Sequence, residues 1–165
     1  KMQATIEEAR INCDSVGGMI ECAILNVPAG IGNPFFDSIE SHLSPLLFSI
    51  PAVKSVSFGL GEKITELYGH EANDCYYYDD EKVKTKTNHN GGITGGISNG
   101  MPIIFRVGIK PTPSISQVQQ TVNIKTKENT ELEIIGRHDP CIVPRAVVVV
   151  ESMAALGILD MMKDI

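Results

Sequence analysis

Three loop-like segments hold the residues whose types and spacing could do chemistry, and the first of them is KPTPS, which we call the lysine–proline loop. In this loop Lys110, Thr112 and Ser114 offer one charged donor and two hydroxyl donors. Pro111 and Pro113 lie between them and reduce the conformational entropy lost when the donors are held in place. A cation with two hydroxyl groups suits a phosphate monoester. The alternative is an ordinary proline-stiffened turn with an exposed lysine.

The second segment, residues 136–141 with the sequence GRHDPC, is called here the arginine–aspartate loop. Arg137 can make a bidentate contact with a carboxylate or a phosphate. Asp139, beside such a cation, could move a proton or orient a group that does. The structural alternative is that Asp139 only pairs with Arg145, which follows a few residues later, and that His138 has no chemical role.

The third segment, residues 88–100, has the sequence NHNGGITGGISNG and is called here the glycine-rich segment. Backbone this permissive can approach a ligand closely and direct several N–H groups at one anion. The segment is not a P-loop, because no GK[ST] follows, and it is not a dinucleotide fingerprint, because a strand rather than a helix follows. A glycine-rich turn between two strands is the alternative.

Taken together, three donor-rich loops separated by apolar strands predict an anionic, phosphate-bearing ligand. No nucleophile–base–acid triad is evident. No cluster has the spacing of metal ligands, so we expect no metal.

Composition narrows the function classes further. The chain has 165 residues, the length of one domain or of two very small ones. Its net charge of −6 argues against a general nucleic-acid binder. It contains no apolar run of about 18 residues, so no membrane span is expected. Its four cysteines form no CxxC pair, which favours free thiols in a reducing cytoplasm and argues against zinc. These features predict a soluble, acidic, cytoplasmic protein.

Periodicity predicts the elements that must position the loops. Residues 2–12 read as a short helix and residues 19–27 as a strand. Asp37 is expected to cap a helix that runs to about residue 48, and residues 52–61 alternate as a second strand. The first third of the chain therefore looks like a β-α-β unit.

Residues 62–90, called here the excursion, differ in composition because they are rich in charge and contain three consecutive tyrosines. We expect an exposed, variable segment in which no residue is a candidate for the site; a flap over the site is the alternative.

The second half of the chain is predicted to contain more strands and a final helix. Residues 102–109 read as a strand, and residues 117–124 as another, paired with residues 132–135 around a turn at residues 128–130. Residues 146–163 read as a helix that is apolar nearly all round and therefore belongs between two layers. The predicted fold class is α+β, a β-α-β sandwich with helices packed between antiparallel or mixed sheets.

These segments together resemble one known family, chorismate synthase. The resemblance covers nearly the whole chain in the family's order and is very specific. It rests on DSVGG at residues 14–18, SIPAVKSVSFGLG at 49–61, NHNGGITGGISNG at 88–100, KPTPSI at 110–115 and GRHDPCIVPRA at 136–146.

The resemblance implies an activity, a cofactor and an assembly. Chorismate synthase completes the shikimate pathway of aromatic amino acid biosynthesis. It converts 5-enolpyruvylshikimate 3-phosphate to chorismate by a trans-1,4 elimination of phosphate. The reaction requires reduced FMN although there is no net redox change. NADPH is a candidate electron source, used by a separate reductase or by the enzyme itself. The family is usually a homotetramer.

The resemblance also implies roles for particular residues. Asp139 matches the family's aspartate that assists proton removal at the flavin. Contacts to FMN are implied at Pro51, Ala52, Gly95, Lys110, Pro111, Thr112, Pro113, Ser114 and Arg137.

The family's amino-terminal half has no counterpart here, and that half carries two catalytic histidines and arginines that hold the substrate. His42, His70, His89 and His138 lie outside those histidine motifs. We therefore expect the chain to be the carboxyl-terminal part of a single chorismate synthase domain, inactive by itself. The alternative is a non-catalytic module that binds flavin or phosphate or contributes to assembly.

Overall fold

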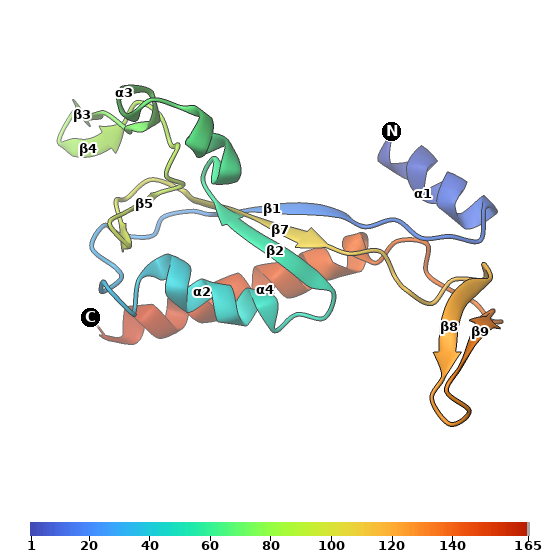
Figure 1. Cartoon of the computed structure of the whole chain (residues 1–165). Coiled ribbons are helices and arrows are strands. Elements are labelled where there is room, and N and C mark those ends of the chain that lie inside the picture. Colours follow the sequence, from blue (N-terminus) through green and yellow to red (C-terminus); the bar gives the residue numbers. More distant parts are fainter. Residues whose placement is uncertain (165) are drawn as a thin grey trace.

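A three-stranded antiparallel sheet forms the centre of the computed structural model, which describes residues 1–164 (Figure 1). Its strands are β1 (Gly18–Ile24), β7 (Ile103–Ile109) and β2 (Val53–Phe58), in the order β1-β7-β2. The expected strands at residues 19–27, 52–61 and 102–109 are confirmed in position, although they are shorter than predicted by two, four and one residues.

The central strand β7 alternates strictly between buried and half-buried residues, as a strand with one face in the core should. Phe105 and Val107 face the core and are fully buried. Arg106, on the opposite face, pairs with Glu21 of β1 at 2.5 Å and donates to the Gly59 carbonyl oxygen at 2.6 Å. One face of the sheet is therefore apolar and the other is polar.

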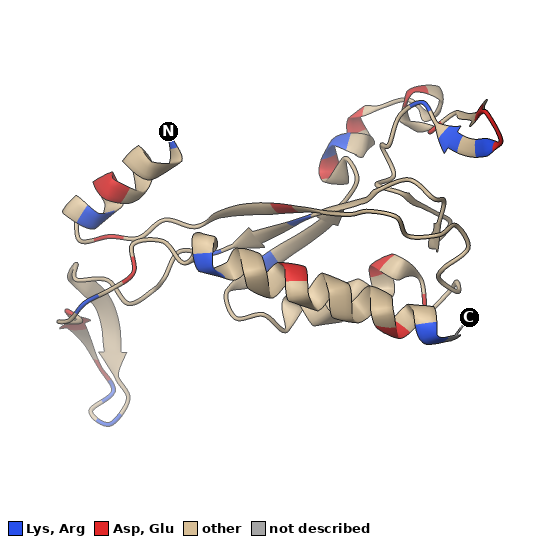
Figure 2. Ribbon diagram, turned by 180° about the vertical axis from the view of Figure 1, so that it is seen from behind, with Lys and Arg blue, Asp and Glu red and all other residues tan. Residues whose placement is uncertain are grey.

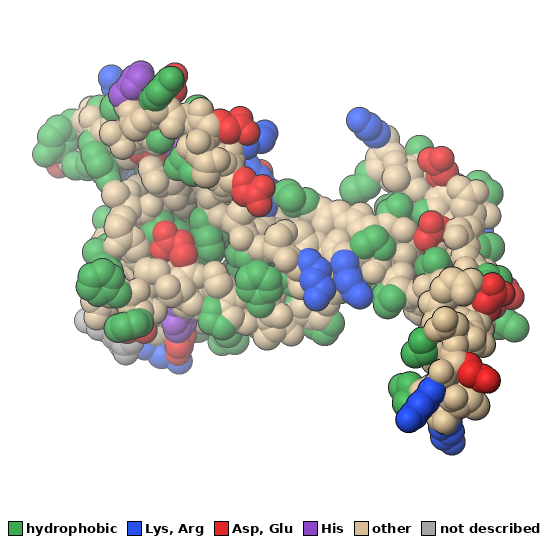
Figure 3. Space-filling view, viewed as in Figure 1, with side chains coloured by type: hydrophobic (Ala, Val, Ile, Leu, Met, Phe, Trp, Pro, Cys, Tyr) green, Lys and Arg blue, Asp and Glu red, His purple; other side chains and the backbone are tan. Residues whose placement is uncertain are grey.

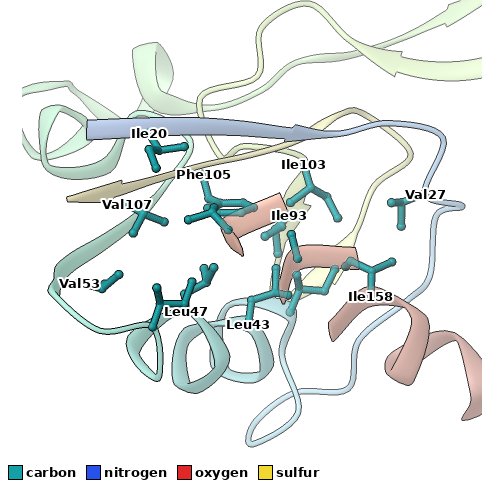
Figure 4. Close-up of a cluster of buried hydrophobic side chains, with 14 of the residues drawn as sticks. Ile20, Val27, Leu43, Leu47, Val53, Ile93, Ile103, Phe105, Val107 and Ile158 are labelled. Carbon is teal, nitrogen blue, oxygen red and sulfur yellow. The ribbon is translucent and has the colours of Figure 1, made fainter. Parts of the chain in front are cut away.

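Two helices cover the apolar face: α2 (Ile39–Phe48) and α4 (Val143–Met161). In Figure 4, side chains of β1, β2 and β7 point toward Leu43, Leu47 and Ile158 of the helices. Gly157 lies where the helices approach, because a Cβ there would stand 2.6 Å from Leu43 Cδ2. The core is this single layer between sheet and helices, and the predicted α+β class is confirmed.

The outer face of α4 is apolar yet uncovered. Figure 2, seen from behind, shows this helix in front with few charged residues along it. Val148, Leu156 and Leu159 are all more than half exposed. Within residues 1–164 no second sheet packs on this face. The chain thus supplies one sheet and the helices of the predicted sandwich.

Two hairpins and a short helix extend from the central layer (Figure 1). Helix α1 is Met2–Ile11, close to the expected helix at residues 2–12. The excursion contains helix α3 (Gly69–Ala72) and the hairpin of β3 (Tyr76–Asp79) and β4 (Lys82–Thr85), after a 3₁₀ helix at Gly61–Glu66.

The second hairpin joins β8 (Gln119–Asn123) to β9 (Glu128–Leu132) and projects from the opposite end of the molecule. Figure 3 shows hydrophobic side chains at the surface of both hairpins. Their small two-stranded sheets bury little of their own apolar surface.

Three local predictions are wrong in detail. Helix α2 is capped by Ser38, whose hydroxyl accepts from the Ser41 amide at 3.1 Å, while Asp37 forms a backbone bridge with Asn33. The turn of the second hairpin lies at residues 124–127 instead of 128–130, because the Asn123 side chain accepts from the Lys125 and Thr126 amides. Its second strand therefore lies at Glu128–Leu132 instead of residues 132–135. Helix α4 begins at Val143, three residues earlier than expected, since Pro144 is well placed in a first turn.

Candidate functional site

The lysine–proline loop begins where β7 ends, and this places it beside the start of β2. Val53 of β2 is paired with Ile109, and the Lys110 amide donates to the Ala52 carbonyl oxygen at 2.9 Å. Pro51 is exposed and Ala52 half-buried. Two segments separated by more than fifty residues in the chain thus meet at one end of the sheet.

The segment before β1 ties this end together. The Ser15 hydroxyl donates to the Thr112 carbonyl oxygen at 2.6 Å, and the Val16 amide donates to the Pro140 carbonyl oxygen at 2.8 Å. A Cβ at Gly17 would overlap the Ile109 carbonyl oxygen, so only glycine allows this approach. The lysine–proline loop and the arginine–aspartate loop are consequently both tied to the residues that precede β1.

Asp139 forms an ion pair with Arg145, which is the structural alternative raised by the sequence. Arg145 Nη1 lies 2.7 Å from Asp139 Oδ2, and Nη2 donates to Oδ1 at 3.2 Å. The guanidinium therefore orients the carboxylate through both oxygens. The Arg145 side chain is 76% exposed, so the pair contributes little stability but leaves the carboxylate reachable from solvent.

Arg137 is exposed, and no ion pair joins it to another residue in the described part of the chain. Next to it, a ring nitrogen of His138 lies 2.9 Å from the Ile134 carbonyl oxygen. In the described chain Arg137 is thus exposed and without an ion pair, whereas His138 makes a local contact with its own loop.

Thr112 carries an observation that points to a ligand. Its Oγ1 atom is buried and has no hydrogen-bond partner within residues 1–164. Buried hydroxyl groups are normally satisfied, and an orphan needs an explanation. Lys110, two residues earlier in the same loop, is exposed, and an amine and a hydroxyl are donor types that suit a phosphate group.

The glycine-rich segment forms a tight hairpin, with β5 (Ile93–Thr94) and β6 (Ile97–Ser98) joined by Gly95 and Gly96. Both glycines have positive φ, 62° and 82°, which a two-residue hairpin turn requires. The Gly96 carbonyl oxygen accepts from the Ile39 amide at 3.0 Å, at the start of α2. Nothing lies within 4 Å of a Cβ built on Gly95, so that position is open to solvent.

Gly95 is separated from the other predicted site residues. The Gly91 carbonyl oxygen accepts from the Ile104 amide near the start of β7, whereas Lys110 follows its end. The strand between them has seven residues, a span of roughly 20 Å at about 3.3 Å per residue. The structure therefore brings together Pro51, Ala52 and the lysine–proline loop, ties the arginine–aspartate loop to the same end, and leaves Gly95 apart.

Sequence reasoning passed over Asp74, which lies in the excursion. Its side chain is buried, with 8% exposure, and accepts hydrogen bonds from Thr87 Oγ1, the amides of His89 and Asn90, and Asn90 Nδ2. Burial by itself raises the pKa of Asp74, but these hydrogen bonds outweigh it and lower the pKa from its usual value. Only the fold distinguishes this aspartate from the exposed Asp79 nearby, because both lie in charged, polar sequence.

Side-chain clusters that could hold a metal ion and helices that could cross a membrane are both absent from residues 1–164. No group of three or more His, Cys, Asp or Glu side chains is arranged to hold a metal ion. None of the helices described combines the length and apolar character needed to cross a membrane.

Comparison with known proteins gives a consistent result. The family model described as chorismate synthase matches residues 1–163. The chain belongs to the chorismate synthase family. Curated chorismate synthases from Methanocaldococcus jannaschii and Dehalococcoides mccartyi are each 52% identical, over 163 and 161 residues. A solved chorismate synthase structure superposes with a TM-score of 0.79 at 29% identity, covering 99% of this chain.

The match covers only part of these chorismate synthases. The chain spans 43% of the Methanocaldococcus protein, 44% of the Dehalococcoides protein and 42% of the solved chain. The family and the α+β fold predicted from the motifs are therefore confirmed, while the activity of the longer proteins is a separate question.

Proposed function

We propose that this chain supplies one side of the flavin site of a chorismate synthase that converts 5-enolpyruvylshikimate 3-phosphate to chorismate by 1,4-elimination of phosphate. The observation that carries the proposal is the meeting of residues 51–52 and 110–114 at one end of the sheet, tied by residues 15–16 to the arginine–aspartate loop. Reduced FMN, when bound, supplies the electron density that weakens the allylic carbon–oxygen bond of the leaving phosphate.

The lysine–proline loop would hold the phosphate of FMN. Lys110 provides the charge, while Thr112 Oγ1, buried and unpartnered in the described chain, provides a hydroxyl that such a ligand would satisfy. Arg137 would hold negative charge near the flavin ring. Gly95 enters the proposal only through the family motif, since β7 separates it from the other contacts.

Asp139 would assist removal of the proton that the elimination releases. Arg145 contacts both carboxylate oxygens of Asp139, which fixes the orientation in which the carboxylate can accept a proton. The pair is exposed on the Arg145 side, so a bound ligand could cover it and exclude water.

We further propose that the protein is cytoplasmic, that residues 1–165 are part of one chorismate synthase domain, and that the whole enzyme is a homotetramer with NADPH as the ultimate electron source. These statements follow from the family resemblance and from a composition without disulfide or metal spacing. The competing function is a non-catalytic module that binds flavin or phosphate, or only contributes to assembly.

Anaerobic titration of this chain with reduced FMN, with and without the phosphorylated substrate, tests the proposal. We expect saturable binding that weakens at least tenfold in Arg137→Ala, since a charged hydrogen bond contributes about 1.5–3 kcal/mol. Lys125→Ala, in the projecting β8–β9 turn, is the matched control and should bind as the parent does. Failure of the chain to bind FMN would exclude a flavin site contained in these residues.

A module that binds only phosphate would differ in its response to inorganic phosphate. If the chain contributes to the flavin site, FMN should bind through its ring as well as its phosphate, so inorganic phosphate at millimolar concentration should leave it bound. A phosphate-binding module would instead lose FMN under the same conditions.

A further inference from the structure

Asp74 lies in the excursion, outside every motif that carries the family resemblance, yet it is more thoroughly hydrogen-bonded than any other carboxylate described here. Oδ1 accepts from Thr87 Oγ1 at 2.6 Å and from the His89 amide at 2.7 Å. Oδ2 accepts from the Asn90 amide and from Asn90 Nδ2, both at 2.9 Å. A buried carboxylate with this set of donors serves to hold the chain that provides them.

The chain that provides them is the start of the glycine-rich segment. Asn88 continues the bracing, because its Oδ1 accepts from the Gly92 amide at 2.7 Å and its Nδ2 donates to the Pro102 carbonyl oxygen at 2.9 Å. The His89 carbonyl oxygen in turn accepts from the Leu60 amide at 2.8 Å. The turn held by Asp74 is thus fastened both to the end of β2 and to the start of β7.

The glycine-rich segment needs the hydrogen bonds of Asp74, here called the clamp, because its backbone is flexible. Gly91, Gly92, Gly95 and Gly96 all have positive φ, and glycine-rich chain loses more conformational entropy on ordering than any other. A second tether from the excursion reaches the hairpin itself, since the Tyr76 hydroxyl lies 3.4 Å from Thr94 Oγ1. Without fixed anchors at its start, this segment would present its N–H groups in many directions.

One buried atom of this turn has a hydrogen-bonding capacity that residues 1–164 do not use. The Nδ1 atom of His89 is buried and has no hydrogen-bond partner within residues 1–164. Asp74 fixes the backbone of the same residue. The turn therefore presents a polar atom that a ligand or a further segment would satisfy.

We propose that Asp74 is a positioning residue that holds the glycine-rich segment in the shape in which Gly95, a flavin contact implied by the family motif alone, would meet the flavin. The inference rests on the proposed function for its ligand, and on the hydrogen bonds above for the clamp. It gives the excursion a role: the excursion carries the carboxylate that orders a segment otherwise too flexible to bind.

Asp74→Asn is the decisive variant because it keeps the shape of the side chain. The asparagine can still accept on one side but presents an NH₂ group to donors on the other. We expect the His89 or Asn90 amide to exchange with solvent at least tenfold faster and FMN to bind roughly tenfold more weakly. Thr87→Val, which removes one of the hydrogen bonds, should show a smaller change of the same kind.

Asp79→Asn is the matched control, since Asp79 is an exposed aspartate of the same excursion that pairs with Lys84. It should leave amide exchange at residues 89–90 and FMN affinity unchanged. Affinities are compared below the unfolding temperature of every variant, because a merely structural role would lower that temperature without changing the FMN affinity of the folded protein.

The possible outcomes separate the two proposals. If Asp74→Asn binds FMN as tightly as the parent, or leaves the exchange of both amides unchanged, the positioning role is wrong. If the parent chain itself fails to bind FMN, the proposed function fails, and so does the flavin role of Asp74. Amide exchange would then still show whether Asp74 holds the turn.

Discussion

At the scale of single residues, the same side chain does different work at positions 74 and 139. Asp139 is gripped by an exposed arginine and stays open to solvent, which suits a group that exchanges protons. Asp74 is buried and accepts hydrogen bonds on both oxygens, which suits a fixed anchor. Exposure and donor geometry, both set by the fold, separate the two.

The lowered pKa of Asp74 predicts how stability depends on pH. A carboxyl group whose pKa is lower in the folded than in the unfolded chain stabilises the fold above the unfolded pKa, and this contribution is lost as pH falls through the folded value. We expect the stability difference between the parent and Asp74→Asn to be largest near neutral pH and to shrink below about pH 4. Urea unfolding from pH 7 to pH 3 measures it; a constant difference would contradict the prediction.

At the scale of elements, the site depends on how the segment before β1 meets the end of β7. The Ser15 hydroxyl donates to the lysine–proline loop and the Val16 amide donates to Pro140. The backbone of Gly17 lies against Ile109, with no room for a side chain. Backbone contacts of this kind are not visible in residue types, although the pair of glycines marks the place.

Gly17→Ala tests that junction, and Gly18→Ala is the neighbouring control. A Cβ at Gly17 would overlap the Ile109 carbonyl oxygen and stand 3.0 Å from the Pro111 backbone nitrogen, so strands and loop must separate. We expect a loss of about 1–3 kcal/mol in the free energy of unfolding together with weaker FMN binding. At Gly18 the nearest atom is Val143 Cγ2 at 3.2 Å, a side chain that can shift, so the loss should be under about 1 kcal/mol.

If Gly17→Ala and Gly18→Ala have the same free energy of unfolding, the lysine–proline loop can move aside to make room for the Cβ atom. In that case the contacts of Ser15 and Val16 would not be what holds the two loops to this end of the sheet.

At the scale of the whole molecule, the chain is an incomplete sandwich. One sheet and two helices bury a core, while the outer face of α4 exposes Val148, Leu156 and Leu159. The chain spans less than half of the relatives' length. Chemistry that needs residues from both parts cannot be complete in these residues.

We therefore expect little or no turnover from the isolated chain, even when it binds FMN. Chorismate formation is followed anaerobically with reduced FMN and the phosphorylated substrate, with the full-length Methanocaldococcus jannaschii enzyme as reference. A rate within about tenfold of that reference would overturn the expectation and would require acid–base groups within these residues.

The sequence by itself determined the family, the α+β class and the three strands of the central sheet, because motif order and hydrophobic periodicity are local properties of the chain. It also named the residues of the candidate site, whose roles stay predictions. From the sequence, Asp139 had two possible roles, an ion pair with Arg145 and proton transfer. The structure contains the ion pair, and proton transfer stays a proposal. Only the tertiary structure placed Asp74 as an anchor and Gly95 away from Lys110, since both follow from which strand ends meet. The cap at Ser38 was likewise decided by folded geometry, because Asp37 and Ser38 are both good capping residues and only the backbone path selects between them.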